Sequence, residues 1–183
     1  LPFIHQKGFT GATETSIEPL VPLYRERAKN LIELADGIAQ LLYKSADLPY
    51  DEAGVAKWLT DEGKEHVKVI RDQLAALPSF DKESIEHVIH SYVESLGVKF
   101  KMVAQPVRVA ITGVIGGPGL PEFMLAIGKD ETLARMDRGR LLNKVEIRRS
   151  ARLAVKSKYI KFGLRILFNI YLPVFVGGSA EKH

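Results

Sequence analysis

The residues most suggestive of chemistry lie at positions 107–121, where an apolar run leads into a glycine-rich loop. This segment reads VRVAITGVIGGPGLP. From Thr112 onward it matches the T-G-x-x-x-G-x-G turn of short-chain dehydrogenases, in which glycines let the backbone approach a pyrophosphate at a helix N-terminus. A dinucleotide site is therefore one interpretation of the loop.

The surroundings of the loop disfavour a nucleotide site. A dinucleotide loop should open a βαβ unit early in a strand–helix series, with an acidic residue about 20 positions further on. Here the loop lies past the middle of the chain, after segments of helical periodicity, and the sequence contains no Tyr-x-x-x-Lys pair. A triphosphate loop fits no better, because Gly128 and Lys129 are followed by Asp130 rather than by serine or threonine.

Basic residues around the loop could instead contact RNA. Arg108 interrupts a strongly apolar segment, where an arginine needs either an internal carboxylate partner or an exposed role. Lys99 and Lys101 lead into this segment, and Arg25 and Arg27 lie near the start of the first long predicted helix. Lysine and arginine reach phosphates, and arginine also reads base edges through its planar fork. An ordinary charged surface is the alternative explanation of these basic residues.

Two histidines could suggest a metal site. His87 and His90 share a predicted helix with Glu83 and Glu94 at spacings that bring side chains together. The same positions form the polar face opposite an apolar stripe, no third ligand is indicated, and an H-E-x-x-H motif is absent. We therefore expect a solvated face and no metal site. No serine stands in a G-x-S-x-G turn, so we predict no catalytic residue.

Helical periodicity dominates the elements that must position these residues. The chain has 183 residues and no cysteine, which excludes disulfides and thiolate metal sites. We predict an all-α fold with two small helical subdomains, residues 1–77 and 78–138, and a basic extension at residues 139–183. The predicted helices are Pro22 to Tyr43, one capped by Asp51 and ending near Trp58, one from Thr60 to Leu77, one after Asp81 that stops at Gly97, one after Gln105 and Pro106 that closes at Gly113, one from Pro121 to Gly128, and one capped by Asp130.

The net charge of +4 is unevenly distributed along the chain. Residues 1–137 carry 15 basic and 20 acidic side chains, whereas residues 138–183 carry 11 and 2. The basicity therefore belongs almost entirely to the C-terminal extension. The chain begins with Leu1 rather than methionine, which suggests a piece of a longer protein.

Three segments carry a family likeness. The runs AQPVRVAITG (104–113), PGLPE (118–122) and LAIGKDETLAR (125–135) closely resemble the C-terminal end of bacterial-type glutamyl-tRNA synthetases. Looser matches lie upstream, at RER (25–27) and at YDEAGVAKWL (50–59). The resemblance covers roughly residues 1–138, about three quarters of the chain.

The resemblance implies an α-helical anticodon-binding region made of two subdomains. A splayed anticodon presents unstacked bases that an arginine fork, loop backbone groups and an apolar platform can read. The resemblance assigns these contacts to Arg108, Gly117, Pro118 and Leu120. It further implies that Arg25 or Arg27 reads the third anticodon base. Lys99 and Lys101 are candidate phosphate contacts. Relatives can carry a hydroxyl residue where this chain has Gly117, so recognition there would fall to backbone groups.

The resemblance also implies what this chain does not do alone. The catalytic part of the family binds ATP, with magnesium, through an H-I-G-H-like motif and a K-M-S-K-S-like loop. The first has no counterpart here, and Lys156-Ser157-Lys158 is only a fragment of the second. We therefore expect no cofactor and no activity in this chain alone. The expected partners are tRNA-Glu, with tRNA-Gln left open, and the catalytic domain of the same enzyme, and the expected location is the cytoplasm.

Two alternatives stay open at this point. The anticodon region of a class I lysyl-tRNA synthetase has a similar helical architecture, although the QPVRVAITG and PGL runs disfavour it. The second alternative is a membrane- or protein-docking module that acts through the basic extension. Basic residues from Arg148 to Arg165 lead there into an apolar run at 166–176, which is shorter than the roughly 20 residues needed to span a bilayer. This run could equally pack on the helical domain or contact tRNA.

Overall fold

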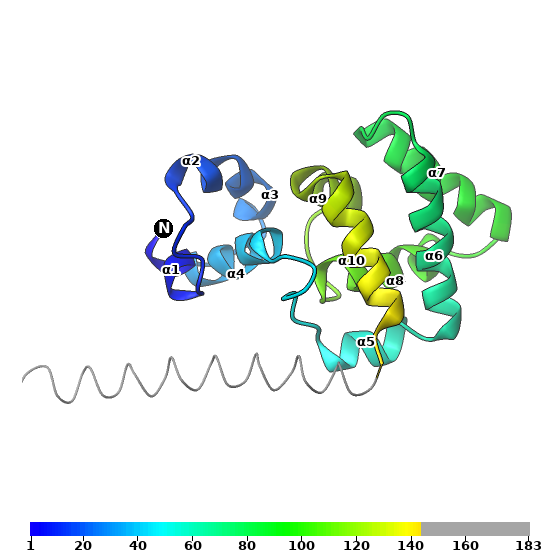
Figure 1. Cartoon of the computed structure of the whole chain (residues 1–183), viewed down its shortest axis with the longest axis horizontal. Helices are drawn as coiled ribbons and strands as arrows, with labels where there is room; N and C mark the ends of the chain where they lie inside the picture. The colour runs from blue at the N-terminus through cyan, green and yellow to red at the C-terminus, as the bar shows by residue number, and fades with distance from the viewer. Residues whose placement is uncertain (144–183) are drawn as a thin grey trace, which may run out of the picture.

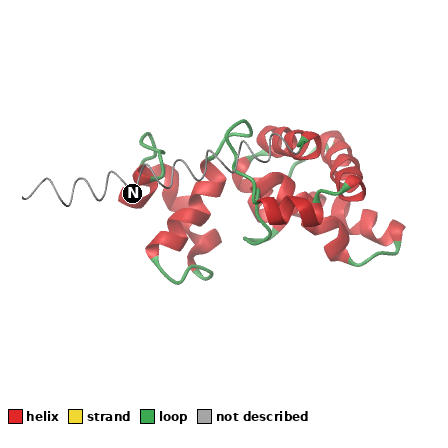
Figure 2. Ribbon diagram, turned by 90° about the horizontal axis from the view of Figure 1, so that it is seen from below, coloured by secondary structure: helices red, strands yellow, loops and turns green. Residues whose placement is uncertain are grey.

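The computed structural model describes residues 1–143, and every regular element in this range is helical (Figure 2). The all-α prediction is therefore confirmed. The elements are α1 (Pro2–Gln6), α2 (Glu14–Ile17), η1 (Glu18–Leu20), α3 (Val21–Arg25), α4 (Leu31–Leu42), α5 (Glu52–Trp58), α6 (Asp61–Ala76), α7 (Lys82–Leu96), α8 (Phe100–Thr112), α9 (Leu120–Ile127) and α10 (Lys129–Leu141).

Helices α1 to α4 form a group of their own at the left of Figure 1. Its small core consists of Ile4, Ile17, Ala35 and Ile38. One long helix was predicted from Pro22 to Tyr43, and this prediction is wrong. The chain instead breaks after α3, and Asn30 starts α4 by accepting hydrogen bonds from the backbone N–H groups of Ile32 (3.0 Å) and Glu33 (2.9 Å).

Helices α5 to α10 surround a second, larger core in which α8 is the central element (Figure 1). Helices α6, α8 and α10 pack against one another, and most of the C-terminal half of α8 is buried. Tyr24 and Leu41 reach this core from the first group of helices. The two helical groups are thus joined by side-chain packing. The subdomain limits at residues 77 and 138 stay a prediction.

Several helix ends fall where the sequence predicts them. Asp51, Thr60 and Asp81 each accept a hydrogen bond from a backbone N–H in the first turn of α5, α6 and α7, at 2.7, 3.2 and 2.8 Å. Gly97 and Gly113 end α7 and α8 in the left-handed conformation, with φ of 64° and 76°. These residues act through local backbone geometry, which is why the sequence alone locates them.

The predicted start of α8 at Gln105 and Pro106 is wrong, because the helix begins at Phe100 and Pro106 lies inside it. A proline within a helix removes one backbone hydrogen bond and needs room for its ring. Gly63 of α6 provides that room, since a Cβ atom there would lie 3.3 Å from the Pro106 ring. The start predicted at Asp130 is also displaced, because α10 begins directly after Gly128.

A buried arginine of α10 ties the two helical groups together. The Arg135 side chain is completely buried and donates hydrogen bonds to the carbonyl oxygens of Gln40 (2.9 Å), Ile111 (3.0 Å) and Tyr43. Its Nε also donates to the carboxylate of Glu131, at 2.9 Å. The guanidinium of Arg135 therefore binds the C-terminal ends of both α4 and α8.

The segment that leaves α4 is held in the same way. Arg138 donates to the carbonyl oxygens of Leu48 (2.9 Å) and Ser45. The Tyr50 hydroxyl donates to the carbonyl of Ala110 at 2.9 Å, and the Asp51 N–H donates to the carbonyl of Gly113 at 2.8 Å. This framework fixes the C-terminal end of α8 and the start of the loop at 113–119.

Candidate functional site

Arg108 lies on α8 opposite the glycine-rich loop. Its Nη1 donates a hydrogen bond to the carbonyl oxygen of Pro118, at 2.6 Å. Within residues 1–143 this is the one hydrogen bond that the guanidinium makes, so the donors on Nη2 and Nε are available to a ligand. Burial lowers the pKa of Arg108, Tyr24 partly offsets that shift, and the charge of Arg27 lowers the pKa further. The guanidinium still carries its charge, because arginine does not deprotonate in proteins.

Gly117 brings the loop close to Arg108. Its φ of 136° belongs to a region that side-chain-bearing residues rarely adopt. A Cβ atom at this position would lie 3.5 Å from Nη1 of Arg108 and 3.8 Å from the hydroxyl of Tyr24. Any other residue at position 117 would therefore have a strained backbone, and its side chain would point toward Arg108 and Tyr24. Burial raises the pKa of Tyr24 to about 12, so its phenol is neutral at pH 7.

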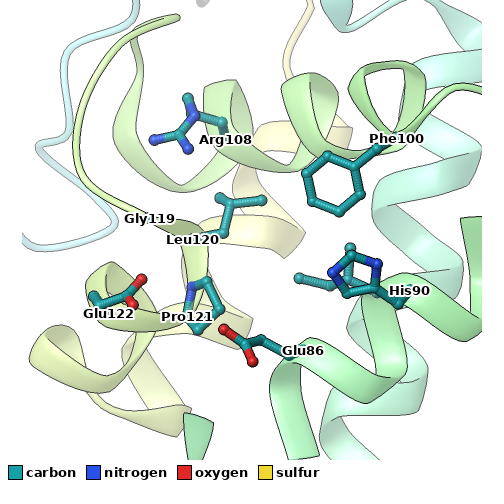
Figure 3. Close-up of a pocket in the computed structure, with 9 residues that line it drawn as sticks. Glu86, His90, Phe100, Arg108, Gly119, Leu120, Pro121 and Glu122 are labelled. Carbon is teal, nitrogen blue, oxygen red and sulfur yellow. The ribbon is translucent and has the colours of Figure 1, made fainter. Parts of the chain in front are cut away.

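A first cavity of about 230 Å³ lies where α7, α8 and the start of α9 meet. Leu120 gives it an apolar floor, with Arg108 on one side and His90 and Phe100 on the other (Figure 3). Glu86 and Glu122 complete its polar lining. We call this space the α7–α9 cavity.

Glu122 is held by a lysine of α7. Lys82 Nζ lies 2.7 Å from its carboxylate, and this hydrogen bond lowers the pKa of Glu122. The carboxylate also folds back over Gly119, where a Cβ atom would lie only 2.0 Å from one of its oxygens. The contact with Lys82 thus holds the Glu122 carboxylate in place at the edge of the cavity and favours its charged form.

A second cavity, of about 380 Å³, lies between the first helical group and the other side of the loop. Arg27, Tyr24, Gln40 and Gly117 are among its lining residues. The Oε1 atom of Gln40 is buried and has no hydrogen-bond partner among the described residues. We call this space the α3–α4 cavity.

The structure brings most of the predicted site residues together. Arg108, Pro118 and Gly117 are in contact or nearly so, Leu120 lies beneath Arg108, and Arg27 lies beyond the loop. Arg25 is exposed at the end of α3 and lines neither cavity in the described part of the chain.

The two predicted phosphate contacts lie at the start of α8. Lys99 and Lys101 are exposed and flank Phe100. Lys101 Nζ lies 5.6 Å from the centre of a Trp58 ring, and Lys57 Nζ lies 5.5 Å from it. The ammonium groups of Lys57 and Lys101 thus both lie over Trp58. The sequence analysis named only Lys101 as a candidate contact.

The histidine cluster has a different arrangement from a metal site. The rings of His90 and Phe100 are stacked, with centroids 5.0 Å apart and an interplanar angle of 24°. Residues 1–143 contain no group of three or more side chains placed to hold a metal ion. The sequence analysis did not find this aromatic pair, because α8 was expected to begin five residues after Phe100.

Comparison with known proteins places this site in a family. Residues 1–140 match the family described as anticodon binding domain. The chain belongs to this family. In this anticodon-binding domain, the matched range contains Arg108, the loop, both cavities and the buried Arg135.

The similar proteins are glutamate–tRNA ligases. The one from Nitratidesulfovibrio vulgaris is 51% identical over 138 residues, and the one from Lawsonia intracellularis is 43% identical over 138 residues. In each case the match covers 75% of this chain and 30% of the relative. The chain thus spans about a third of the length of these relatives.

The fold is also found in solved structures. A glutamate tRNA ligase from Elizabethkingia meningosepticum in complex with its amino acid superimposes with a TM-score of 0.61, at 23% identity, over 70% of this chain and 25% of that one. This similarity shows the fold alone.

The alternatives drawn from the sequence gain no support. The relatives described above are glutamate–tRNA ligases, not lysyl-tRNA synthetases. The docking alternative depends on the basic extension, which from residue 144 lies outside the described residues. Within residues 1–143, no helix is long and apolar enough to cross a membrane.

Proposed function

We propose that this domain recognises the anticodon of tRNA-Glu on behalf of a glutamate–tRNA ligase. The proposal is supported above all by the placement of Arg108, whose guanidinium is held by the Pro118 carbonyl at the edge of an apolar-floored cavity. The identity of 51% to a glutamate–tRNA ligase supports the choice of tRNA.

The two cavities suggest a division of roles around the loop. In the α7–α9 cavity, the free donors of Arg108 would bind a base edge while Leu120 packs against its face. Backbone groups at Gly117 and Pro118 would contact the neighbouring base. In the α3–α4 cavity, Arg27 would read the third base, because Arg27 rather than Arg25 lies beside the loop.

Glutamate attachment would take place in a separate catalytic domain of the same enzyme, which would bind ATP and magnesium. The described residues would contribute to that reaction only by holding the correct tRNA. A cytoplasmic location stays a prediction.

Binding of the full chain to tRNA-Glu transcripts tests the proposal. The transcripts carry either the native anticodon or a substituted one, and affinities are measured at low and moderate salt. Arg108→Ala should reduce the preference for the native anticodon by roughly tenfold or more, since a good arginine–base contact is worth about 1–3 kcal/mol. Arg71→Ala is the matched control, because Arg71 pairs with Asp137 on the surface of α6 and α10 and lines neither cavity.

Arg27 has an internal control two residues away. Arg27→Ala should weaken discrimination at the third anticodon base, whereas Arg25→Ala should leave it unchanged. The proposal is wrong if the full chain binds both transcripts equally and its affinity only falls with salt, because such binding is electrostatic and does not read the anticodon.

A further inference from the structure

The stacked pair of His90 and Phe100 is not explained by the packing of the core. Phe100 is 45% exposed, and His90 is exposed as well. Their rings nevertheless lie nearly parallel at 5.0 Å and line the α7–α9 cavity beside Leu120 (Figure 3). A preformed, solvent-exposed aromatic surface at the edge of a cavity can receive a further flat ring.

The polar groups of the cavity can accept hydrogen bonds from a base. Glu86 and Glu122 line the same space as Arg108. Lys82 Nζ lies 2.7 Å from Glu122 and 3.9 Å from Glu86, so the charges are balanced there. The two carboxylates can accept hydrogen bonds from the amino and imino groups of bases. The volume also suits a small group. Sites for drug-sized molecules occupy about 300–1,000 Å³, whereas this cavity has about 230 Å³.

Phosphate contacts are available outside the cavity. Lys99 and Lys101 precede and follow Phe100, and both are exposed. An aromatic side chain between basic residues is the arrangement by which proteins stack the bases of single-stranded nucleic acid while holding its backbone. The cavity, with its carboxylate acceptors, and the basic edge thus fit the base and the phosphate of one nucleotide.

We propose that the His90–Phe100 pair is a stacking platform for one unstacked nucleobase of the RNA loop that Arg108 reads. The inference rests on the proposed function and adds a base contact that is separate from Arg108. Phe100 offers the exposed ring, His90 supports it from α7, and the floor at Leu120 continues the apolar surface toward Arg108.

A double-mutant cycle between protein and RNA tests this platform. The RNA is a set of tRNA-Glu anticodon stem-loops in which each loop nucleotide in turn is replaced by an abasic one. The full chain and its Phe100→Leu variant are compared on every RNA. Phe100→Leu should weaken binding of the intact loop about tenfold, since stacking of a base on an aromatic side chain is worth about 1–3 kcal/mol. On one abasic RNA, and only there, the variant should bind as well as the unchanged protein.

Matched variants separate stacking from folding. Phe3→Leu makes the same chemical change at a residue of α1 that is 37% exposed and lines neither cavity, so it should bind every RNA like the unchanged protein. His90→Ala should weaken binding at the same loop position as Phe100→Leu, and His90→Phe should restore it. These position-specific effects would not arise from a general loss of stability.

The outcomes distinguish this inference from the proposed function. If the chain prefers the native anticodon through Arg108 but Phe100→Leu acts equally on every RNA, or has no effect, the platform is refuted and the proposed function stands. If the unchanged chain shows no anticodon preference, the proposed function fails, and the platform fails with it.

Discussion

Replacement of Arg135 by methionine should be among the most damaging single changes in this domain. Methionine keeps much of the length of the side chain but removes all of its donors. The carbonyls of Gln40 and Ile111 belong to the last turns of α4 and α8, and Tyr43 directly follows α4. Carbonyls in the last turn of a helix have no partner within it, so these groups depend on Arg135.

The expected loss follows from the buried contacts. The Arg135 side chain has no exposed surface, and its partner Glu131 is 18% exposed. Removing one member of a buried ion pair costs about 3–5 kcal/mol, and each buried carbonyl left without a donor costs about 1–3 kcal/mol. These terms overlap, so we expect a loss of about 3–5 kcal/mol. Domains have a total stability of about 5–15 kcal/mol, and the variant should therefore be close to unfolding.

Urea unfolding monitored by circular dichroism measures this effect. Arg135→Lys keeps the charge but loses the planar fork, so it should lose less stability and supplies the measurement if the methionine variant does not fold. Glu131→Gln tests the ion pair separately. A loss below about 1 kcal/mol for Arg135→Met, comparable with surface substitutions, would refute the idea that this guanidinium joins the two helical groups.

Three further predictions concern the loop and the edges of the site. Gly113→Ala should destabilise the domain by more than about 1 kcal/mol in urea unfolding, because its φ is 76° and a Cβ atom would lie 2.0 Å from the Pro49 carbonyl; an unchanged midpoint would contradict this. The lowered pKa of Glu122 means that its pairing with Lys82 stabilises the fold above the ordinary carboxyl pKa and is lost as pH falls through the folded-state pKa. Lys82→Met should accordingly raise the Glu122 pKa in a carbon-13 NMR titration, and an unmoved pKa would contradict this pairing. Lys101→Gln should reduce the salt dependence of RNA binding by about 0.7 in log–log slope if it contacts one phosphate of the loop; a change in anticodon preference instead would mean that Lys101 reads bases.

Sequence reasoning was accurate where local chemistry sets the structure. The side chains of Asp51, Thr60 and Asp81 each accept a hydrogen bond from the N–H group three residues further on, so these caps can be predicted without knowledge of the rest of the fold. The break before α4 had a comparable signal in Asn30 followed by Glu33, whose carboxylate accepts a hydrogen bond from the Lys29 N–H at 2.9 Å. This signal was missed because the spacing of apolar residues between Pro22 and Tyr43 favoured one continuous helix.

Sequence reasoning was wrong where a distant contact sets the structure. Pro106 ordinarily marks the start of a helix, and α8 extends past it because Gly63 on another helix leaves space for the ring. The same misplaced boundary put Phe100 outside α8, and so its stacking on His90 was not foreseen. The error in one helix end thus carried over into the description of the site.

Arg108 and Arg135 show why a sequence cannot by itself separate a binding arginine from a structural one. Arg108 is half-buried on α8 and Arg135 is buried on α10, so each charged side chain is at least partly removed from water. Arg135 meets carbonyl groups at the ends of α4 and α8 and the carboxylate of Glu131, which together use all of its donors. Arg108 meets a loop whose glycine backbone offers it one carbonyl and leaves the rest of its fork facing a cavity. The difference arises from what the fold places opposite each guanidinium, and at Arg108 the fold leaves donors unused. Within residues 1–143 these donors are not among the buried atoms that lack a partner, so water can reach them in the free domain and an RNA base could take the place of that water.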